Sequence, residues 1–147
     1  MKYDSATPYI AVFVIFRKDN KVAFVLRQNT NWMDGYYDLP AGKVEVGESY
    51  LQAAVREAKE EAGVMVRPAD LKHLLTSHRK TNDMTWVDVV FEAKQWQGEL
   101  YNAEPDKHSA LDWLDIDNLP DNVAPPGLYR LNQIKAGNRY AEYGWPE

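Results

Sequence analysis

The chain contains no cysteine, which excludes disulfide bonds, thiolate metal sites and a cysteine nucleophile. Its longest apolar run, YIAVFVIF at Tyr9–Phe16, spans eight residues, a length that suits a buried strand and cannot cross a bilayer. The N-terminal segment MKYDSATP lacks the basic and apolar regions of a secretory signal. These absences predict a cytoplasmic protein that has no membrane partner.

A basic block is missing as well. The sequence has 17 basic residues against 22 acidic ones, for a formal net charge of −5. Because no cluster of Lys and Arg could follow a phosphate backbone, we expect no polymeric nucleic acid as a partner. An acidic protein can still bind a small phosphorylated ligand when divalent cations lie between the two negative partners.

Length and composition fit one globular domain over residues 1–147. Of the 147 residues, 45% are hydrophobic and 27% are charged. Segments rich in β-branched and aromatic residues predict strands at 9–16, 22–26, 71–77, 84–94 and 110–114. Helices are predicted from about Ser49 to Ala62 and from Pro125 to Gly137. This order indicates an α+β sandwich with a mixed sheet, and not a regular βα repeat.

The middle helix is unusually acidic. A polar loop at 28–38 and a tight bend at 39–42 lead toward it. Ser49 and Gln52 form a capping-box pattern at its start, and Gly63 supplies a left-handed stop at its end. At roughly 100° per residue, three glutamates share one sector beside a stripe of small apolar residues. These glutamates are Glu57, Glu60 and Glu61.

Two interpretations of this acidic stripe compete. A charge run on a helix is most often a solvated face. A solvated helix normally places a basic residue four positions from each glutamate, yet here only Arg56 and Glu60 have that spacing. The preceding segment LPAGKVEVGE brings another carboxylate, Glu48, and several backbone carbonyls to the same neighbourhood. Because Mg²⁺ requires clustered oxygen ligands of this kind, the stripe predicts a site for a divalent cation.

The same residues match a known signature. It consists of a glycine, five residues, a glutamate, seven residues and the string Arg-Glu-apolar-x-Glu-Glu-x-Gly-apolar. In this chain the positions are Gly42, Glu48 and Arg56–Val64. The chain therefore resembles the Nudix hydrolase family, of the MutT type, and its segments LPAG and LDWLDIDNLP are similar to that family too. The resemblance implies an α/β/α sandwich with a catalytic loop and helix.

The resemblance also implies hydrolysis of a nucleoside diphosphate linked to a further group, by attack of water on phosphorus. Mg²⁺, or Mn²⁺ in its place, would neutralise the polyanion and activate the water. Glu60 and Glu61 would be the principal metal ligands, together with the carbonyl of Ala41. Glu57 would be a ligand through water or the base that deprotonates the nucleophile. Glu48 would support a second metal or its water.

Other roles follow from the same resemblance. Arg56 would orient the carboxylates by charge-assisted hydrogen bonds, the alternative being a simple surface pair with Glu60. Ala41 stands where the family usually has glycine, and it supplies the same carbonyl. Gly42 would serve the conformation of the loop and leave space near phosphate. Glu104 lies where MutT-like relatives carry a loop carboxylate that completes the metal site, with a solvated position as the equal alternative.

Candidate substrate contacts lie outside the signature. Arg27, at the end of the second predicted strand, would contact phosphate or pair with a surface carboxylate. A purine base needs a stacking face and amide-like hydrogen bonds, and Trp32, Tyr37 and Asn122 are the candidates, although most aromatic residues in such folds belong to the core. The histidines show no ligand spacing, which favours surface or hydrogen-bonded positions for His73, His78 and His108.

Weaker signals bear on the substrate. Relatives specific for ADP-ribose or dinucleoside polyphosphates carry a proline or tyrosine shortly beyond the signature, and RKTN at 79–82 offers neither. This favours a hydrolase of nucleoside triphosphates, normal or oxidised, that releases a nucleoside monophosphate and pyrophosphate. A nucleotide-sugar or a dinucleoside polyphosphate is the alternative substrate. A non-catalytic nucleotide-sensing module is the alternative class, although no signature glutamate is lost. A small nucleotide is the expected partner, and a homodimer is left open.

Overall fold

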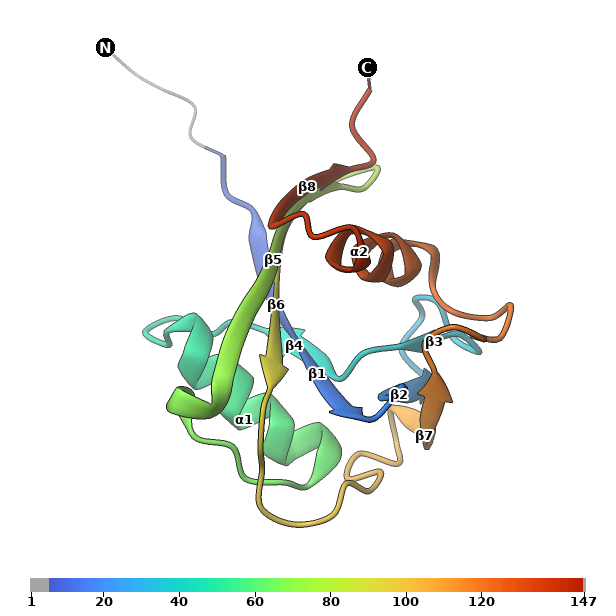
Figure 1. The fold of residues 1–147 in the computed structure, drawn as a ribbon. Helices are drawn as coiled ribbons and strands as arrows, with labels where there is room; N and C mark the ends of the chain where they lie inside the picture. The colour runs from blue at the N-terminus through green and yellow to red at the C-terminus, as the bar shows by residue number, and fades with distance from the viewer. Residues whose placement is uncertain (1–5, 147) are drawn as a thin grey trace.

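The computed structural model describes residues 6–146 of the chain (Figure 1). Most strands form from apolar runs, because both faces of the sheet are buried under other elements. In chain order the strands are β1 (Tyr9–Lys18), β2 (Lys21–Arg27), β3 (Tyr37–Asp38), β4 (Ala41–Lys43), β5 (Leu71–Lys80), β6 (Thr85–Ala93), β7 (His108–Asp115) and β8 (Tyr140–Tyr143). The helices are α1 (Tyr50–Ala62) and α2 (Pro125–Lys135), and a short 3-10 helix, η1 (Pro68–Asp70), precedes β5.

Strand β1 joins two groups of strands into one mixed sheet. On one side of the molecule the order is β4-β1-β6-β5-β8, with β1 antiparallel to β4 and parallel to β6. The C-terminal end of β1 pairs with β2, which in turn pairs with both β3 and β7. This topology places the segment that leads into α1 and the β5–β6 hairpin on either side of β1.

The two helices cover opposite faces of the sheet (Figure 1). Along β1, Val14 and Phe16 belong to the core that includes the buried alanines of α1. Phe13 and Ile15 point the other way, into the core that includes Leu131 of α2. The alternation follows from the two-residue period of a strand. The predicted α/β/α sandwich with a mixed sheet is confirmed.

The predicted caps of α1 are present in the structure. Ser49 Oγ accepts from the Gln52 N–H at 3.1 Å, and Gln52 Oε1 accepts from the Ser49 N–H at 2.8 Å. Gly63 ends the helix in the left-handed region at φ 71°. The helix predicted to run to Gly137 ends at Lys135. Four short elements, β3, β4, β8 and η1, are not predicted by the sequence, because two to four residues show no periodicity.

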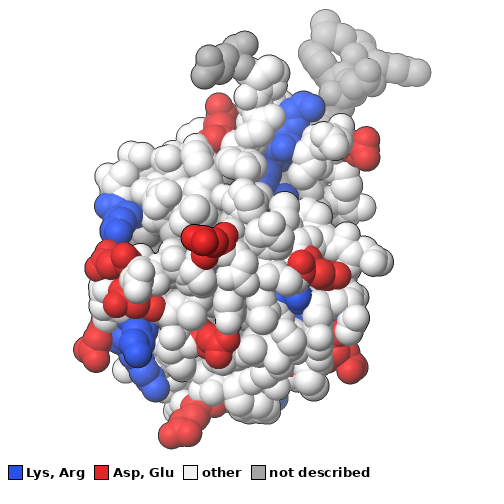
Figure 2. Space-filling view, turned by 90° about the vertical axis from the view of Figure 1, so that its right-hand side faces the viewer, with Lys and Arg blue, Asp and Glu red and all other residues white. Residues whose placement is uncertain are grey.

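No helix among residues 6–146 is long and apolar enough to cross a bilayer. Figure 2 shows acidic and basic side chains dispersed among uncharged ones on one face of the molecule. Among the described residues on that face, neither sign of charge forms a continuous area.

Candidate active site

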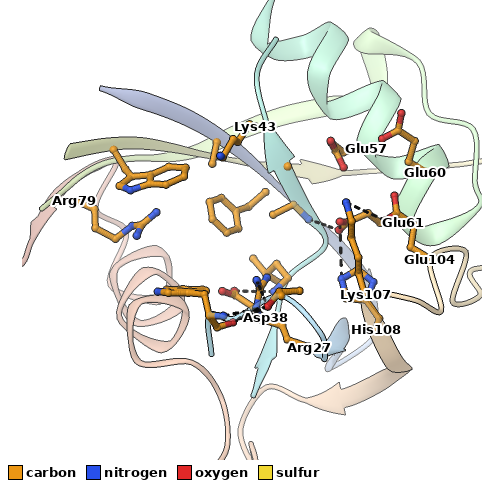
Figure 3. Close-up of a pocket in the computed structure, with 18 of the residues that line it drawn as sticks. Arg27, Asp38, Lys43, Glu57, Glu60, Glu61, Arg79, Glu104, Lys107 and His108 are labelled. Carbon is orange, nitrogen blue, oxygen red and sulfur yellow. Dashed lines mark hydrogen bonds and ion pairs between the residues drawn. The ribbon is translucent and has the colours of Figure 1, made fainter. Parts of the chain in front are cut away.

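A cavity of about 1130 Å³ lies between α1, the β5–β6 hairpin and the loop that precedes β3. Figure 3 shows a group of glutamates on one side of this cavity and Arg79 of β5 on the opposite side. The glutamates are Glu57, Glu60, Glu61 and Glu104. Because the lining comes from segments far apart in the sequence, the sheet topology is what assembles the cavity.

Arg56 of α1 holds three of the signature glutamates together. Its Nε and Nη2 donate to the carboxylate of Glu48 at 2.7 and 2.9 Å. Its Nη1 donates to Glu57 at 2.5 Å and to Glu60 at 3.1 Å. The hydrogen bonds from Arg56 lower the pKa of Glu48 to about 2, so this carboxylate is ionised at neutral pH. Arg56 is therefore bound to a cluster, and not to Glu60 alone.

Glu57 and Glu61 are the buried members of the cluster, with exposed fractions of 6% and 7%. Burial raises the pKa of Glu57 to about 7, against the opposing effect of Arg56. Burial first, and then the charge of Glu57, raise the pKa of Glu61 well above its ordinary value. Glu61 Oε1 accepts from the backbone N–H of Ala41 at 2.7 Å. Two adjacent buried acids of this kind need a further cation if both are to be ionised.

Gly42 of β4 allows the carboxylate of Glu57 to lie against the backbone. A Cβ atom at position 42 would overlap that carboxylate, so glycine is required by the contact. Gly47 has open space around it but adopts φ +81°, a conformation that favours glycine. At position 42, the space left by the absent side chain is filled by the carboxylate of Glu57. The interval between Gly42 and Glu57 in the signature reflects this packing contact.

The donor set suits a hard divalent cation. Carboxylates of Glu57, Glu60, Glu61 and Glu104 line the same side of the cavity, and Mg²⁺ and Mn²⁺ bind such oxygen donors. A cation among them would also offset the charges that burial disfavours. No three side chains of metal-binding type within residues 6–146 are gathered closely enough to hold an ion. The guanidinium of Arg56 and the backbone N–H of Ala41 bond to three of these carboxylates, Glu57, Glu60 and Glu61.

The loop ahead of β7 and the first residue of β7 add Glu104 and His108 to this side of the cavity. Glu104 lines it, with its carboxylate 3.4 Å from the Nζ of Lys107. His108 is 3% exposed, its Nε2 lies 3.9 Å from Glu61, and its buried Nδ1 has no partner among the described residues. Burial lowers the pKa of His108 to about 4, so the ring is neutral at pH 7. The expectation of a surface or hydrogen-bonded histidine is wrong for His108.

Arg27 and Trp32 both line the cavity. Arg27 donates to the carbonyl of Trp32 at 2.9 Å and to Thr30 Oγ1 at 3.0 Å, and its guanidinium lies 5.0 Å from the centroid of the Trp32 ring. Arg27 therefore holds the loop that carries Trp32. The alternative of a pair with a surface carboxylate is corrected by these contacts.

Two expected substrate contacts, Tyr37 and Asn122, are outside the lining of the cavity. The Tyr37 hydroxyl donates to Asp112 of β7 at 2.5 Å, and this bond raises the pKa of Tyr37 to about 12. Asn122 Nδ2 donates to the carbonyl of Gly35 at 3.0 Å. Both polar groups are used to fasten neighbouring segments, which corrects the expectation that they contact a base.

The lining of the cavity also contains residues that the sequence alone does not indicate. They include Phe13, Asp38, Lys43, Arg79, Trp86 and Arg130. The one local signal is Asp88, an aspartate within the apolar run WVDVVF, since a buried carboxylate needs a cation nearby. Asp88 accepts from Arg79 at 2.6 and 3.1 Å and from Arg130 at 3.2 Å. No local pattern indicates that one of these partners comes from α2.

A sequence model of the NUDIX domain matches residues 7–132. The chain belongs to the Nudix family. It is 34% identical over 113 residues to the ADP-ribose pyrophosphatase of Methanocaldococcus jannaschii, a match that covers 77% of this chain and 65% of that protein. It is 31% identical over 119 residues to the 8-oxo-dGTP diphosphatase of Escherichia coli, covering 79% of this chain and 90% of that protein.

Solved structures agree with this assignment. A MutT Nudix hydrolase from Burkholderia pseudomallei has 28% sequence identity and a TM-score of 0.79, covering 86% of this chain and 98% of that one. The resemblance read from the signature is thereby confirmed, and the chain is a Nudix hydrolase. Nudix hydrolases in general use divalent metals such as Mg²⁺. The substrates of the family vary, as the named relatives show: one is an ADP-ribose pyrophosphatase and another an 8-oxo-dGTP diphosphatase.

Proposed function

We propose that this Nudix hydrolase cleaves nucleoside triphosphates, normal or oxidised, to a nucleoside monophosphate and pyrophosphate. The observation that carries the proposal is a cavity with carboxylates on one side and tryptophans with arginines on the other. When the triphosphate group lies at the carboxylates, the base of the same nucleotide can reach the tryptophans on the other side of the cavity. The relative that acts on 8-oxo-dGTP supports this substrate class, because the match extends over 90% of its length.

The residues that would hold Mg²⁺ are Glu60 and Glu61, with the carbonyl of Ala41, and with Glu104 as a further oxygen donor. When bound, Mg²⁺ supplies positive charge that neutralises the phosphates and makes a bound water more acidic. Lys43 and Lys107 also line the cavity, and their ammonium groups balance part of the charge of a polyphosphate.

Glu57 is the residue that we assign as base. Its carboxylate faces the cavity, lies against Gly42 and is held by Arg56. It accepts the proton of the attacking water while the water oxygen forms a bond to phosphorus and the bridging P–O bond breaks. Arg56 remains protonated throughout because a guanidinium does not lose its proton in proteins. Arg56 therefore orients Glu57 and Glu60, and the ionised Glu48 behind it fixes its position.

A nucleotide-sugar is the second candidate substrate. The archaeal ADP-ribose pyrophosphatase, at 34% identity, favours it. The chemistry at phosphorus would be the same, and only the group beyond the diphosphate would differ. The segment RKTN at 79–82, which lacks a proline or tyrosine, places this candidate second.

A substrate panel with one active-site variant tests the proposal. Normal and oxidised nucleoside triphosphates, ADP-ribose and diadenosine polyphosphates are incubated with the enzyme in Mg²⁺ or Mn²⁺, and the products are separated by chromatography. We expect a triphosphate to be the best substrate. Glu60→Gln should lower turnover at least a hundredfold, the order seen when a charge-stabilising group is removed. Glu61→Gln should do the same.

The matched control is Glu99→Gln, because Glu99 is exposed and does not line the cavity. It should keep wild-type turnover, and all three variants should keep the wild-type circular dichroism spectrum. Faster cleavage of ADP-ribose than of every triphosphate would establish the second candidate. Near-normal turnover in Glu60→Gln would remove that residue from the metal site.

A further inference from the structure

Arg79 is a buried arginine with one unengaged corner that faces the cavity. The residue is 6% exposed, and Figure 3 shows its guanidinium directed into the cavity from the side opposite the glutamates. Its Nε and Nη2 donate to the two oxygens of Asp88 at 2.6 and 3.1 Å. Its third nitrogen, Nη1, has no hydrogen-bond partner within residues 6–146. The orientation of the guanidinium is thus fixed while a donor is left for a ligand.

The fixing partner is itself held in place. Asp88 is fully buried and also accepts from Arg130 at 3.2 Å. Arg130, at 1% exposed, pairs in turn with Asp38 at 3.3 Å. Breaking such a buried pair is costly, so the chain of ion pairs makes Arg79 a rigid element of the cavity wall.

Two indole rings limit how a ligand can approach Arg79. Its guanidinium carbon lies 4.8 Å from the centroid of Trp86 and 5.9 Å from that of Trp32. Both tryptophans line the cavity. Flat apolar walls of this kind accept a planar ring more readily than a hydrated phosphate group. A planar ring that binds beside these indoles presents its edge to Nη1.

The chemistry of Nη1 then discriminates between rings. A guanidinium has donors only, so the facing atom of the ring must be an acceptor. Guanine, hypoxanthine and uracil carry a carbonyl oxygen at this edge, whereas adenine and cytosine carry an amino group there. An amino group at this position would place its N–H donors opposite the N–H donors of Nη1. Neither group would then have an acceptor, which is unfavourable in a buried site.

We propose that Arg79 is the specificity-determining residue of the cavity. It selects nucleotides whose base carries a carbonyl oxygen at the ring position where adenine or cytosine carries its exocyclic amino group, here called keto bases. The inference rests on the proposed function for the position of the phosphates at the glutamates. It assigns the opposite side of the cavity to base recognition, and Lys43 and Lys107 to the phosphates. The test therefore measures base preference by binding, which does not depend on hydrolysis.

Inosine and adenosine monophosphates form a matched ligand pair, because carbonyl and amino groups replace each other at one ring position. Each is titrated into the purified enzyme with Mg²⁺, and binding is followed by tryptophan fluorescence, which Trp32 and Trp86 should report. We expect inosine monophosphate to bind at least tenfold more tightly. Guanosine and uridine monophosphates should exceed adenosine and cytidine monophosphates in the same way. Equal binding across the pair overturns the proposal.

Arg79→Lys and Arg79→Gln locate the preference. Lysine keeps the charge beside Asp88 but loses the planar corner, so the tenfold ratio should fall to near one. Glutamine offers both a donor and an acceptor and should narrow the ratio as well. Arg67→Lys is the matched control, because Arg67 makes the same two-point pair, with Asp70 at 3.1 and 3.0 Å, outside the cavity. It should leave the ratio at ten or more.

Thermal melting identifies variants that fail to fold. If neither Arg79 variant folds, equal binding of inosine and adenosine monophosphates by the wild-type enzyme still overturns the proposal. A keto preference in an enzyme that hydrolyses no triphosphate refutes the proposed function and sustains this inference. Triphosphate hydrolysis and binding without base preference refute the inference and sustain the proposed function. An unchanged preference in a folded Arg79→Lys variant shows that another residue reads the base.

Discussion

Replacing Glu57 by glutamine should remove a pH dependence that the buried acidic helix imposes on the stability of the metal-free protein. Burial raises the pKa of Glu57 from its ordinary 4.5 to about 7. The folded state therefore keeps this proton over a pH range in which the unfolded chain releases it. The stabilisation is fully present below pH 4.5 and is lost as the pH rises toward 7.

The size of the effect follows from the pKa difference. At about 1.4 kcal/mol for each pH unit, the interval from 4.5 to about 7 corresponds to about 3 kcal/mol. The pKa of Glu61 is raised partly by the charge of Glu57, so the substitution relaxes it and adds to the difference in the same sense. The lowered pKa of His108 acts in the opposite sense, but it is present in both proteins and largely cancels.

The assay is urea unfolding in EDTA, followed by circular dichroism at several pH values between 4.5 and 8. The free energy of unfolding of the wild type, minus that of Glu57→Gln, should fall by about 3 kcal/mol over this range. The variant should be the more stable protein above pH 7. Parallel stability curves for the two proteins would refute the reasoning. Adding Mg²⁺ at pH 8 should stabilise the wild type more than the variant, since a cation favours the ionised carboxylate.

Two further predictions concern positions where the structure fixes a role. Gly42→Ala should reduce turnover at least a hundredfold, because the added Cβ displaces the carboxylate of Glu57. The circular dichroism spectrum should stay unchanged. Turnover above a tenth of wild type would show that Glu57 can act from another position. Tyr37→Phe should lose about 1 kcal/mol of stability with its bond to Asp112, while its KM stays within a factor of two. A large rise in KM would return Tyr37 to the substrate site.

Local patterns in the sequence account for the frame of the site. The capping box at Ser49, the stop at Gly63 and the acidic stripe are all contained in one continuous segment, and α1 forms as they predict. The burial of Glu57 is a tertiary property, because it depends on how β4 lies against α1. The signature spacing contains this contact, but the sequence alone does not show that position 42 must be glycine to accommodate a side chain.

The side of the cavity that carries Arg79 could not be predicted for a different reason. Arg79, Asp88 and Arg130 come from β5, β6 and α2, and their pairing exists only after the sheet has brought these elements together. Tyr37 shows the opposite error, in which an aromatic residue beside the signature is used by β7 instead of by a ligand. Tyr37 is predicted to be a substrate contact because it lies next to the signature in the sequence. Arg79 is not predicted to be one because it lies far from the signature in the sequence.

The contact between Gly42 and Glu57 has a consequence for protein engineering. The connecting segment between them works as a spacer that sets the height at which the helix meets the edge strand. Exposed positions of the spacer such as Val46 and Tyr50 can be varied. Glu48 and Arg56 cannot, because their bonds tie spacer and helix together. Gly47, at φ +81°, and the fully buried Ala53 and Ala54 are constrained as well. The length of the spacer cannot be varied. One inserted or deleted residue would rotate the acidic face of the helix by roughly 100° and turn the glutamates away from the cavity.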